Sequence, residues 1–365
     1  MRVMFWMISS GDGILGGHQR QVKETARRLE ALGVSTVIAM EKEPSLEGID
    51  VVHSFGLEPE RMRRCRDRGI PVVTSPIYWE RSYAFGLRSN LTGMALLKYK
   101  ARMALVLARS ALKGEFPQKC EAAVKRQIDL RVIYEMSDLL LPNSRMEADA
   151  ITRELGVSTP QHVAPNAVDP EAFTLPAPGT KRDEVLFVGR MEPHKNQIGL
   201  IMAMRRSKIA VRITGFAHPH HEKYMRQCQQ AAAGCGNITI EPPPADGTLA
   251  QMYQRAKVHV LPSWFETTGL VSLEAALCGC NIVTTDRGYA RDFFGDLAWY
   301  CDPSRPHTIR EAIEKAMEAP YRSAMREKIL NRYTWEHTAA ETLAGYEMVL
   351  GMRKAEREER MAAAQ

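Results

Sequence analysis

The most constraining feature of this sequence is a repeated alternation of short apolar runs with longer amphipathic stretches. Apolar runs of strand length that are separated by helical patterns are typical of a parallel sheet with helices on both faces. The alternation fills the first third of the chain and restarts after segment 165–179, which is rich in Pro, Ala and Gly. The sequence therefore predicts an α/β fold of two doubly wound Rossmann-like domains, at residues 1–170 and 171–334.

The predicted elements follow the same order in both halves. The first helix begins at about His18 and ends at Gly33, with four apolar residues on one face: Val22, Ala26, Leu29 and Leu32. Further helices are predicted around 59–68, from Gln197, and at 222–232 and 249–256. The predicted strands are residues 2–8, 34–40, 49–53, 71–74, 138–142, 184–188, 210–214, 237–240 and 258–261.

Composition is that of an ordinary globular protein, with 45% hydrophobic and 25% charged residues in a length of 365. The apolar start is too short for a signal peptide and no uncharged stretch is long enough to span a membrane, so we expect a cytoplasmic protein. Seven cysteines without a C-x-x-C pair are more consistent with reduced thiols than with a disulfide framework.

The net charge of +6 indicates nucleic acid only weakly, and we expect no nucleic-acid partner. Segment 80–133 contains eleven basic and four acidic residues, so the basicity belongs to one part of the chain. Within it, the stretch from Leu91 to Lys113 has a cationic and an apolar side at helical spacing. It would bring the protein to an anionic surface at the inner face of the membrane; alternatively, its apolar side packs on the first domain's sheet.

Open α/β sheets bind ligands beyond the carboxyl ends of their strands, so two such domains that face a central cleft present their loops to a ligand. In the first half, four glycines follow the first strand and open a helix: Gly11, Gly13, Gly16 and Gly17. Bare backbone N–H groups there could bind an anion, as in a dinucleotide-binding G-x-G-x-x-G motif. However, the first acidic residue beyond the second strand, Glu41, is about 30 residues away instead of about 20. A glycine turn without a ligand is the alternative.

In the second half, Gly189, Arg190 and Lys195 lie in the loop that leaves the strand at 184–188. Two fixed cations in the cleft would stabilise a diphosphate leaving group without a metal ion; the alternative is a solvated pair of loop residues. A later segment ends a strand at Pro262 and opens a helix near Gly269, with Glu266 before that helix and Glu274 within it. A carboxylate before an anion-binding helix is expected where it accepts hydrogen bonds from sugar hydroxyls.

The pattern P-S-x-x-E-x-x-G-L-x-x-x-E-A, with seven residues between Glu266 and Glu274, resembles the E-x7-E motif of retaining glycosyltransferases of glycosyltransferase family 4, which have the GT-B fold. The resemblance covers nearly the whole chain. In order, it includes Gly16-Gly17-His18, Asp50 to His53, Ser137 to Ser144, Pro165 to Asp169, Gly189-Arg190 with Lys195, Asp286 to Asp292, and a last helix from Trp335 that would pack back onto the first domain.

This resemblance implies that the C-terminal domain binds a nucleotide-sugar donor and that the N-terminal domain binds the acceptor. Glu274 would contact the ribose and Glu266 the donor sugar, while Arg190 and Lys195 would contact the diphosphate. The donor would also meet the glycines at 16, 17 and 189 and the backbone N–H groups of four consecutive residues: Thr268, Gly269, Leu270 and Val271.

One departure concerns the first domain, where the family's usual histidine is absent and Ser75 and Pro76 stand instead. The candidates for the acceptor side are therefore His18, Ser75, Tyr78 and Trp79. No D-x-D pair occurs, and the histidines at 218, 220 and 221 lack a carboxylate or thiol at ligand spacing, so we expect neither a metal nor another cofactor.

The sequence thus predicts a retaining glycosyltransferase that moves a sugar from a nucleoside diphosphate donor, a UDP-sugar, to a glycan or lipid-linked glycan in cell-surface polysaccharide or glycolipid synthesis. Two alternatives stay open. A nicotinamide-dependent oxidoreductase would use the first glycine loop, and a catalytically silent GT-B binding protein would explain the missing histidine.

Overall fold

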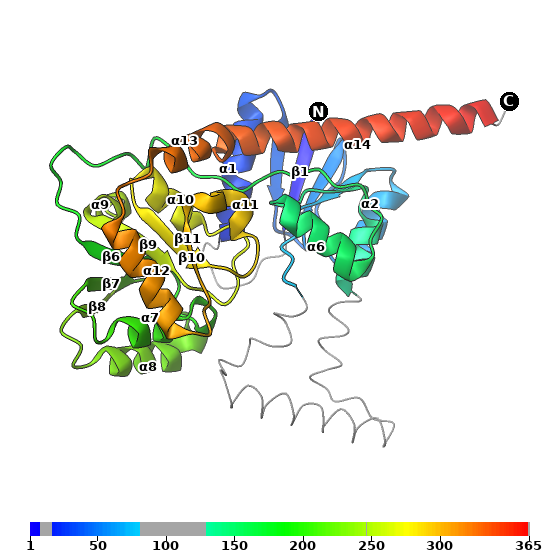
Figure 1. Cartoon of the computed structure of the whole chain (residues 1–365). Helices are drawn as coiled ribbons and strands as arrows, with labels where there is room; N and C mark the ends of the chain where they lie inside the picture. Colours follow the sequence, from blue (N-terminus) through cyan, green and yellow to red (C-terminus); the bar gives the residue numbers. More distant parts are fainter. Residues whose placement is uncertain (8–16, 81–128, 246, 364–365) are drawn as a thin grey trace, which may run out of the picture. The chain divides into compact units, whose positions relative to one another are not determined.

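The computed structural model of this chain describes residues 1–7, 17–80, 129–245 and 247–363. These residues form two compact units, each built on one parallel sheet (Figure 1). The first unit takes its described residues from Met1–Tyr78, Phe116–Ala167 and Tyr333–Gln365, and the second takes them from Trp79–Glu115 and Val168–Arg332.

The sheet of the first unit has the order β2-β1-β3-β4-β5, and every pairing in it is parallel. Its strands are β1 (Arg2–Met7), β2 (Ser35–Ala39), β3 (Val51–Phe55), β4 (Val72–Thr74) and β5 (Leu139–Leu140). All residues of β1 after Arg2 are buried. Continuous burial of this kind is expected for a parallel strand that helices cover on both faces.

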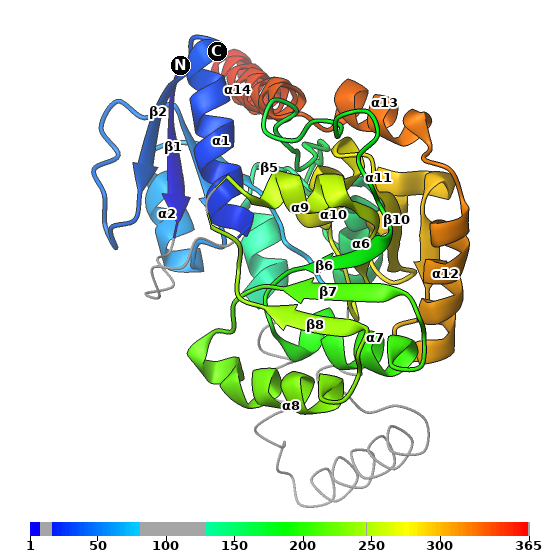
Figure 2. The ribbon, with the colours of Figure 1, turned by 90° about the vertical axis from the view of Figure 1, so that its left-hand side faces the viewer.

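The labelled helices of the first unit are α1 (Gly17–Ala31), α2 (Pro59–Asp67), α6 (Arg145–Leu155) and α14 (Trp335–Ala363), and residues 129–136 are also helical. Figures 1 and 2 show α1 and α14 side by side on one face of the sheet. Leu29 of α1 and Tyr346 of α14 belong to one buried core with β1 and β3. Ion pairs between Arg28 and Glu336 (3.0 Å) and between Arg353 and Asp138 also bind α14 to this unit.

The sheet of the second unit has the order β11-β10-β9-β6-β7-β8, again with parallel pairings. Its strands are β6 (Glu184–Val188), β7 (Ala210–Thr214), β8 (Ile238–Glu241), β9 (Ala256–Leu261), β10 (Asn281–Thr285) and β11 (Trp299–Cys301). Strands β7 and β8 extend the sheet on one side of β6, and β9, β10 and β11 extend it on the other side. The strand order therefore reverses between β6 and β9, which makes this position the switch point of the sheet.

Helices cover both faces of this second sheet. Helices α7 (Gln197–Met204), α8 (Glu222–Ala232) and α12 (Pro306–Glu318) pack into one core on one face. Helices α9 (Leu249–Arg255) and α10 (Leu270–Leu277) lie on the other (Figure 1). The other helices that the structure describes in this unit are α11 (Ala290–Phe294), α13 (Ser323–Arg332) and the short 3₁₀ turns η1 (Pro193–Lys195), η2 (Pro219–His221) and η3 (Gly295–Leu297).

The predicted fold class, two Rossmann-like α/β domains, is confirmed. The bounds of β6, β7 and α8 coincide with those predicted from sequence, and α7 begins at the predicted Gln197. Leu32 was wrongly placed on the buried face of the first helix, because α1 ends at Ala31 and the Leu32 side chain is 51% exposed. The predicted strand at 138–142 shortens to β5, since Pro142 has no N–H to donate to a ladder.

Two observations concern the chemistry of the chain as a whole. In the part that the structure describes, no helix combines the length and the apolar character needed to cross a membrane. The six cysteines in the described ranges are free thiols.

Candidate active site

The candidate site of the second unit lies at the switch point of its sheet. The loop after β6 runs from Gly189 to Lys195, and the loop after β9 runs from Pro262 to Gly269. The amide of Trp264 in the second loop donates a hydrogen bond to the carbonyl of His194 in the first (2.9 Å). Because ligands of open α/β sheets bind at such a point, these two joined loops are the place to look for functional side chains.

Lys195 and Glu266, one from each loop, form an ion pair. The distance between Lys195 Nζ and Glu266 Oε1 is 2.6 Å. The Lys195 side chain is 17% exposed and the Glu266 side chain 6%, so both charges are largely withdrawn from water. Such a pair compensates the cost of desolvation only while both partners are present. We call Lys195 and Glu266 the site pair.

The backbone of Glu266 is held by the loop that follows β10. The Glu266 amide donates to the carbonyl of Arg287 (3.3 Å), and the Tyr289 amide donates to the carbonyl of Glu266 (2.8 Å). Between them, Gly288 has φ +88°, and a Cβ atom there would stand 2.2 Å from the Glu266 carbonyl oxygen. Only glycine permits this approach, so Gly288 allows the two segments to pair.

Arg190 lies in the same loop as Lys195 but has a different partner. Its guanidinium is 3.0 Å from Glu192 Oε1, and its side chain is 55% exposed. Glu192 Oε2 is also 4.0 Å from His221 Nε2. The two cations predicted from sequence are therefore each placed against a carboxylate; Lys195 is no solvated loop residue, whereas Arg190 is open to a ligand.

Glu274 lies in the second turn of α10 and is buried. The hydroxyl of Tyr253, which is on α9 and fully buried, donates to Glu274 Oε2 at 3.1 Å. Burial, and after it the nearby Glu274 carboxylate, raises the pKa of Tyr253 well above its usual value. Tyr253 thus stays a hydrogen-bond donor that orients Glu274. No sequence motif indicated this partner, because it comes from a different helix.

The segment from Thr268 to Val271 forms the start of α10. Gly269 is the N-cap residue in a left-handed conformation (φ +74°), and it has no side chain with which to cap the helix. Amide groups in the first turn of a helix lack partners within the helix. Leu270 and Val271 are only partly buried, so an anion can approach these amides. The positive end of the helix dipole adds to this attraction.

His194 sits beside the site pair and was not selected from the sequence. Burial lowers its pKa to about 2, and the neighbouring charges of Lys195 and Arg190 act in the same direction. Its ring stacks on that of Trp79 at a centroid distance of 4.8 Å and an interplanar angle of 11°. His194 is therefore a neutral side chain, and Trp79, predicted on the acceptor side, packs here as part of the second unit.

Ser75 of the first unit is buried in a chain of hydrogen bonds. Its hydroxyl is 2.8 Å from His53 Nε2, and His53 Nδ1 is 2.7 Å from the Tyr346 hydroxyl of α14. Burial lowers the pKa of His53 to about 3, so the imidazole is neutral. The Ser75 hydroxyl thus has a protein partner, and this chain fixes the end of β4 to the last helix.

Tyr78 is fully buried, and both its backbone amide and its hydroxyl are hydrogen-bonded to α6. Its amide donates to Glu147 Oε1 (2.8 Å) and its hydroxyl donates to Glu154 Oε2 (2.6 Å). Glu147 also accepts a hydrogen bond from the amide of Asn143 (2.7 Å). Burial raises the pKa of Glu147 to about 7, although these hydrogen bonds oppose the shift. Tyr78 therefore holds the segment after β4 in place.

The remaining predicted residues are placed as follows. Gly189 directly follows β6, and its amide donates to the carbonyl of Thr214 (3.1 Å). Gly17 and His18 begin α1. Gly16 and the stretch from Leu91 to Lys113 lie outside the described residues.

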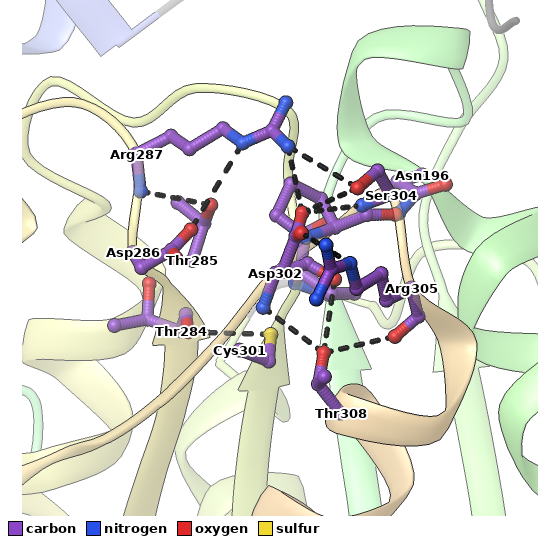
Figure 3. A network of polar contacts seen from close by, with 12 residues as sticks. Asn196, Thr284, Thr285, Asp286, Arg287, Cys301, Asp302, Ser304, Arg305 and Thr308 are labelled. Atoms are coloured by element: carbon purple, nitrogen blue, oxygen red, sulfur yellow. Dashed lines mark hydrogen bonds and ion pairs between the residues drawn. The ribbon is translucent and has the colours of Figure 1, made fainter. Parts of the chain in front are cut away.

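A polar network that links the loop after β10 to the segment after β11 was not predicted (Figure 3). Arg287 contacts Asp302 Oδ1 at 2.7 Å and Ser304 Oγ at 3.3 Å, and its guanidinium lies 5.4 Å from the centre of the Trp264 ring. Burial opposes ionisation of Asp302, but hydrogen bonds from Ser304 and Arg287 outweigh it and lower the pKa of Asp302. The turn Asp302–Arg305, which we call the anchor turn, therefore binds the loop that carries Arg287.

No group of three or more His, Cys, Asp or Glu side chains suited to a metal ion occurs among the described residues. Of the histidines at and before η2, the rings of His218 and His220 lie 4.8 Å apart, and His221 is 4.0 Å from Glu192. The structure thus offers no metal-binding set at the switch point within the residues that it describes.

Known proteins resemble both the sequence and the fold. Residues 171–332 match the family model described as Glycosyl transferases group 1. A D-inositol 3-phosphate glycosyltransferase of Pseudarthrobacter chlorophenolicus is 28% identical, over 93% of this chain and 92% of that protein. The protein of the same name in Stackebrandtia nassauensis is 27% identical, over 92% of this chain and 87% of its own length.

Among solved structures, sucrose-phosphate synthase from Thermosynechococcus elongatus has a TM-score of 0.75 at 15% identity and covers 96% of this chain and 100% of its own. HepE from Anabaena, solved with UDP and glucose, has a TM-score of 0.67 at 14% identity and covers 94% and 99%. These similarities are those of the GT-B fold. The family model and the curated relatives favour glycosyl transfer over the oxidoreductase alternative. The second unit thus matches the glycosyl transferases group 1 model, and the chain is a glycosyltransferase with the GT-B fold.

Proposed function

We propose that this protein belongs to the retaining enzymes of glycosyltransferase family 4 and transfers a sugar from a nucleoside diphosphate donor, a UDP-sugar, to an acceptor hydroxyl. The observation that carries the proposal is the site pair at the switch point, beside the uncapped start of α10. A cation, the backbone amides at a helix start and carboxylates within one loop pair suit a ligand that combines a diphosphate with sugar hydroxyls.

Each part of the donor has a fitting partner. Lys195, Arg190 and the amides from Thr268 to Val271 bind the diphosphate and stabilise its charge as the glycosidic bond breaks. Glu274, oriented by Tyr253, accepts hydrogen bonds from the ribose hydroxyls. Glu266 accepts hydrogen bonds from the donor sugar once the diphosphate has replaced Glu266 as the partner of Lys195. This set supplies positive charge without a metal ion, so the proposed reaction is metal-independent.

The choice of UDP is supported by solved proteins of the same fold. HepE from Anabaena was solved with UDP and with UDP-glucose, at TM-scores of 0.61 in both cases. At 16% and 14% identity this likeness concerns the fold alone, so the base is a proposal to be tested against GDP and ADP donors.

The acceptor is a hydroxyl held by the first unit. The curated relatives are named for D-inositol 3-phosphate, which makes a phosphorylated cyclitol the first acceptor to test. A glycan or lipid-linked glycan at the inner face of the membrane is the second, and it is the one that polysaccharide or glycolipid synthesis would use.

The test has two stages. Nucleotides are first screened by thermal unfolding, since a ligand at 100 times its Kd stabilises by about 2.7 kcal/mol. The best donor is then incubated with D-inositol 3-phosphate or a glycan acceptor, and NMR of the product reports the anomeric configuration. We expect UDP to stabilise and the product to retain the donor's configuration. Stabilisation by NAD alone, or an inverted product, would contradict the proposal.

A further inference from the structure

We infer that Asn196 and Arg287 are positioning residues, which use the anchor turn to hold the site pair in its working geometry. The inference rests on the proposed function only in its kinetic readout. Asn196 lies outside the segments that relate this chain to glycosyltransferases, and Arg287 lies within one of them, segment 286–292, to which the resemblance assigned no role. The structure links both of them to the same turn, which lies more than thirty residues beyond Glu266 in the sequence.

Asn196 follows Lys195 directly and has an unusual backbone. Its φ of +59° is the one positive value among the non-glycine residues that the structure describes. Left-handed conformations of such residues persist where surrounding contacts fix them, and they are concentrated at functional sites. Asn196 ends η1 and precedes α7, so its backbone forms the turn that directly follows Lys195.

The carboxamide of Asn196 supplies the fixing contacts. Its Nδ2 donates to the carbonyl of Pro262 (3.1 Å) and to the carbonyl of Pro303 (2.9 Å). Pro262 begins the loop that carries Glu266, and Pro303 lies in the anchor turn. The Asn196 side chain is closely enclosed, because a Cβ at Gly199 would stand 2.5 Å from its Oδ1. One side chain therefore joins both loops of the site pair to the anchor turn.

Arg287 makes the complementary connection from the loop after β10. Its guanidinium binds Asp302 and Ser304 of the anchor turn (Figure 3). Its carbonyl accepts the hydrogen bond from the Glu266 amide. The same guanidinium lies over the Trp264 ring, two residues before Glu266. Arg287 thus restrains Glu266 through the backbone and through the neighbouring ring.

These contacts fix the geometry of the site pair from two sides. Lys195 is restrained through Asn196 and Glu266 through Arg287, and both restraints end on residues 302–304. None of these contacts uses the Lys195 or Glu266 side chain, so they do not compete with a donor for these two side chains. Loss of either restraint should leave the binding groups present but displaced, and small displacements at a reacting centre reduce turnover strongly.

The first experiment measures the restraint without any substrate. Amide hydrogen exchange is followed in segments 262–268 and 286–289 for the wild type, Arg287→Met and Asn196→Gly. Glycine keeps the left-handed backbone accessible and removes only the carboxamide. Arg310→Met is the matched control, since Arg310 pairs with Glu314 (2.7 Å) within α12. We expect faster exchange than in the wild type in both segments for Arg287→Met and Asn196→Gly. The control should exchange at the wild-type rate.

The second experiment measures transfer with the donor found for the wild type. We expect kcat to fall by about tenfold to a hundredfold in Arg287→Met and Asn196→Gly, with the Kd for UDP changed less than about threefold. Arg287→Lys, which restores a cation near Asp302, should recover part of kcat. Exchange and kcat equal to those of Arg310→Met would overturn the inference. If the wild type transfers no sugar, the proposed function fails, and the exchange experiment still decides the inference.

Discussion

Replacement of Glu266 by Gln should tighten the binding of UDP while it abolishes sugar transfer. In the ligand-free protein the Lys195 ammonium is already bound, 2.6 Å from the Glu266 carboxylate. A diphosphate has to compete with that carboxylate for the ammonium and is repelled by its charge. Glutamine has nearly the same shape and can still accept a hydrogen bond, but it offers Lys195 a neutral partner.

The expected gain follows from the strength of the bond that UDP must replace. A hydrogen bond to a charged group contributes about 1.5–3 kcal/mol, and a neutral one about 0.5–1.5 kcal/mol. The difference of about 1–2 kcal/mol corresponds to roughly fivefold to thirtyfold tighter binding. The same change leaves Lys195 without its countercharge, so the free energy of unfolding should fall by up to about 3–5 kcal/mol without ligand.

Isothermal titration with UDP decides the matter. The wild type is compared with Glu266→Gln and with Glu314→Gln, which removes an exposed carboxylate from the pair with Arg310. In a Lys195→Met background, the gain from Glu266→Gln should shrink to the part that comes from lost charge repulsion, because no ammonium is left to release. Equal or weaker UDP binding by a folded Glu266→Gln protein would refute the reasoning. A gain of the same size without Lys195 would also refute it.

Three further outcomes are expected. Tyr253→Phe should weaken UDP binding about tenfold in the same titration, since it removes the donor that orients Glu274; Tyr224→Phe on α8 is the control, and equal effects would contradict the assignment. The raised pKa of Glu147, about 7 against 4.5, means that the unfolded chain releases this proton first as pH rises. Its contribution to the free energy of unfolding should therefore decline between pH 4.5 and 7 by up to about 3 kcal/mol. In denaturant titrations at a series of pH values, the free energy of unfolding of Glu147→Gln should not show this decline. Transfer should continue in EDTA, whereas a loss that manganese restores would show that the site needs a metal.

The fold was predictable because local patterns and the alternation of elements agree with the global structure. Strand β6 is a short apolar run that ends at a glycine, and α8 has apolar residues at helical spacing, so their bounds follow from the chain itself. The loops after β6 and β9 could be selected for the same reason. Their meeting at a switch point depends on the strand order, which no local pattern encodes.

The partners within the site were less predictable. That Lys195 pairs with Glu266 depends on the distance between two loops far apart in sequence. That Arg190 pairs with Glu192 depends on the conformation of a single loop. Tyr253 and Arg287 act through contacts with other elements and have no motif of their own. Ser75 was chosen for its position after β4, but the buried His53 determines what its hydroxyl contacts. Tertiary contacts, not local sequence, decide these roles.

The position of α14 in the first unit has a consequence for biosynthesis. The core around β1 and β3 includes Ala339, Tyr346 and Val349, which a ribosome adds after the uninterrupted stretch Val168–Arg332 has been made. Domains usually fold during synthesis in the order in which they leave the ribosome. Here the strands and most of the core of the second unit are synthesised before α14. Until α14 is translated, β1 lacks one of the helices that cover it. A chaperone that binds this chain on the ribosome would therefore be expected to shield the first unit, and to release it only near termination.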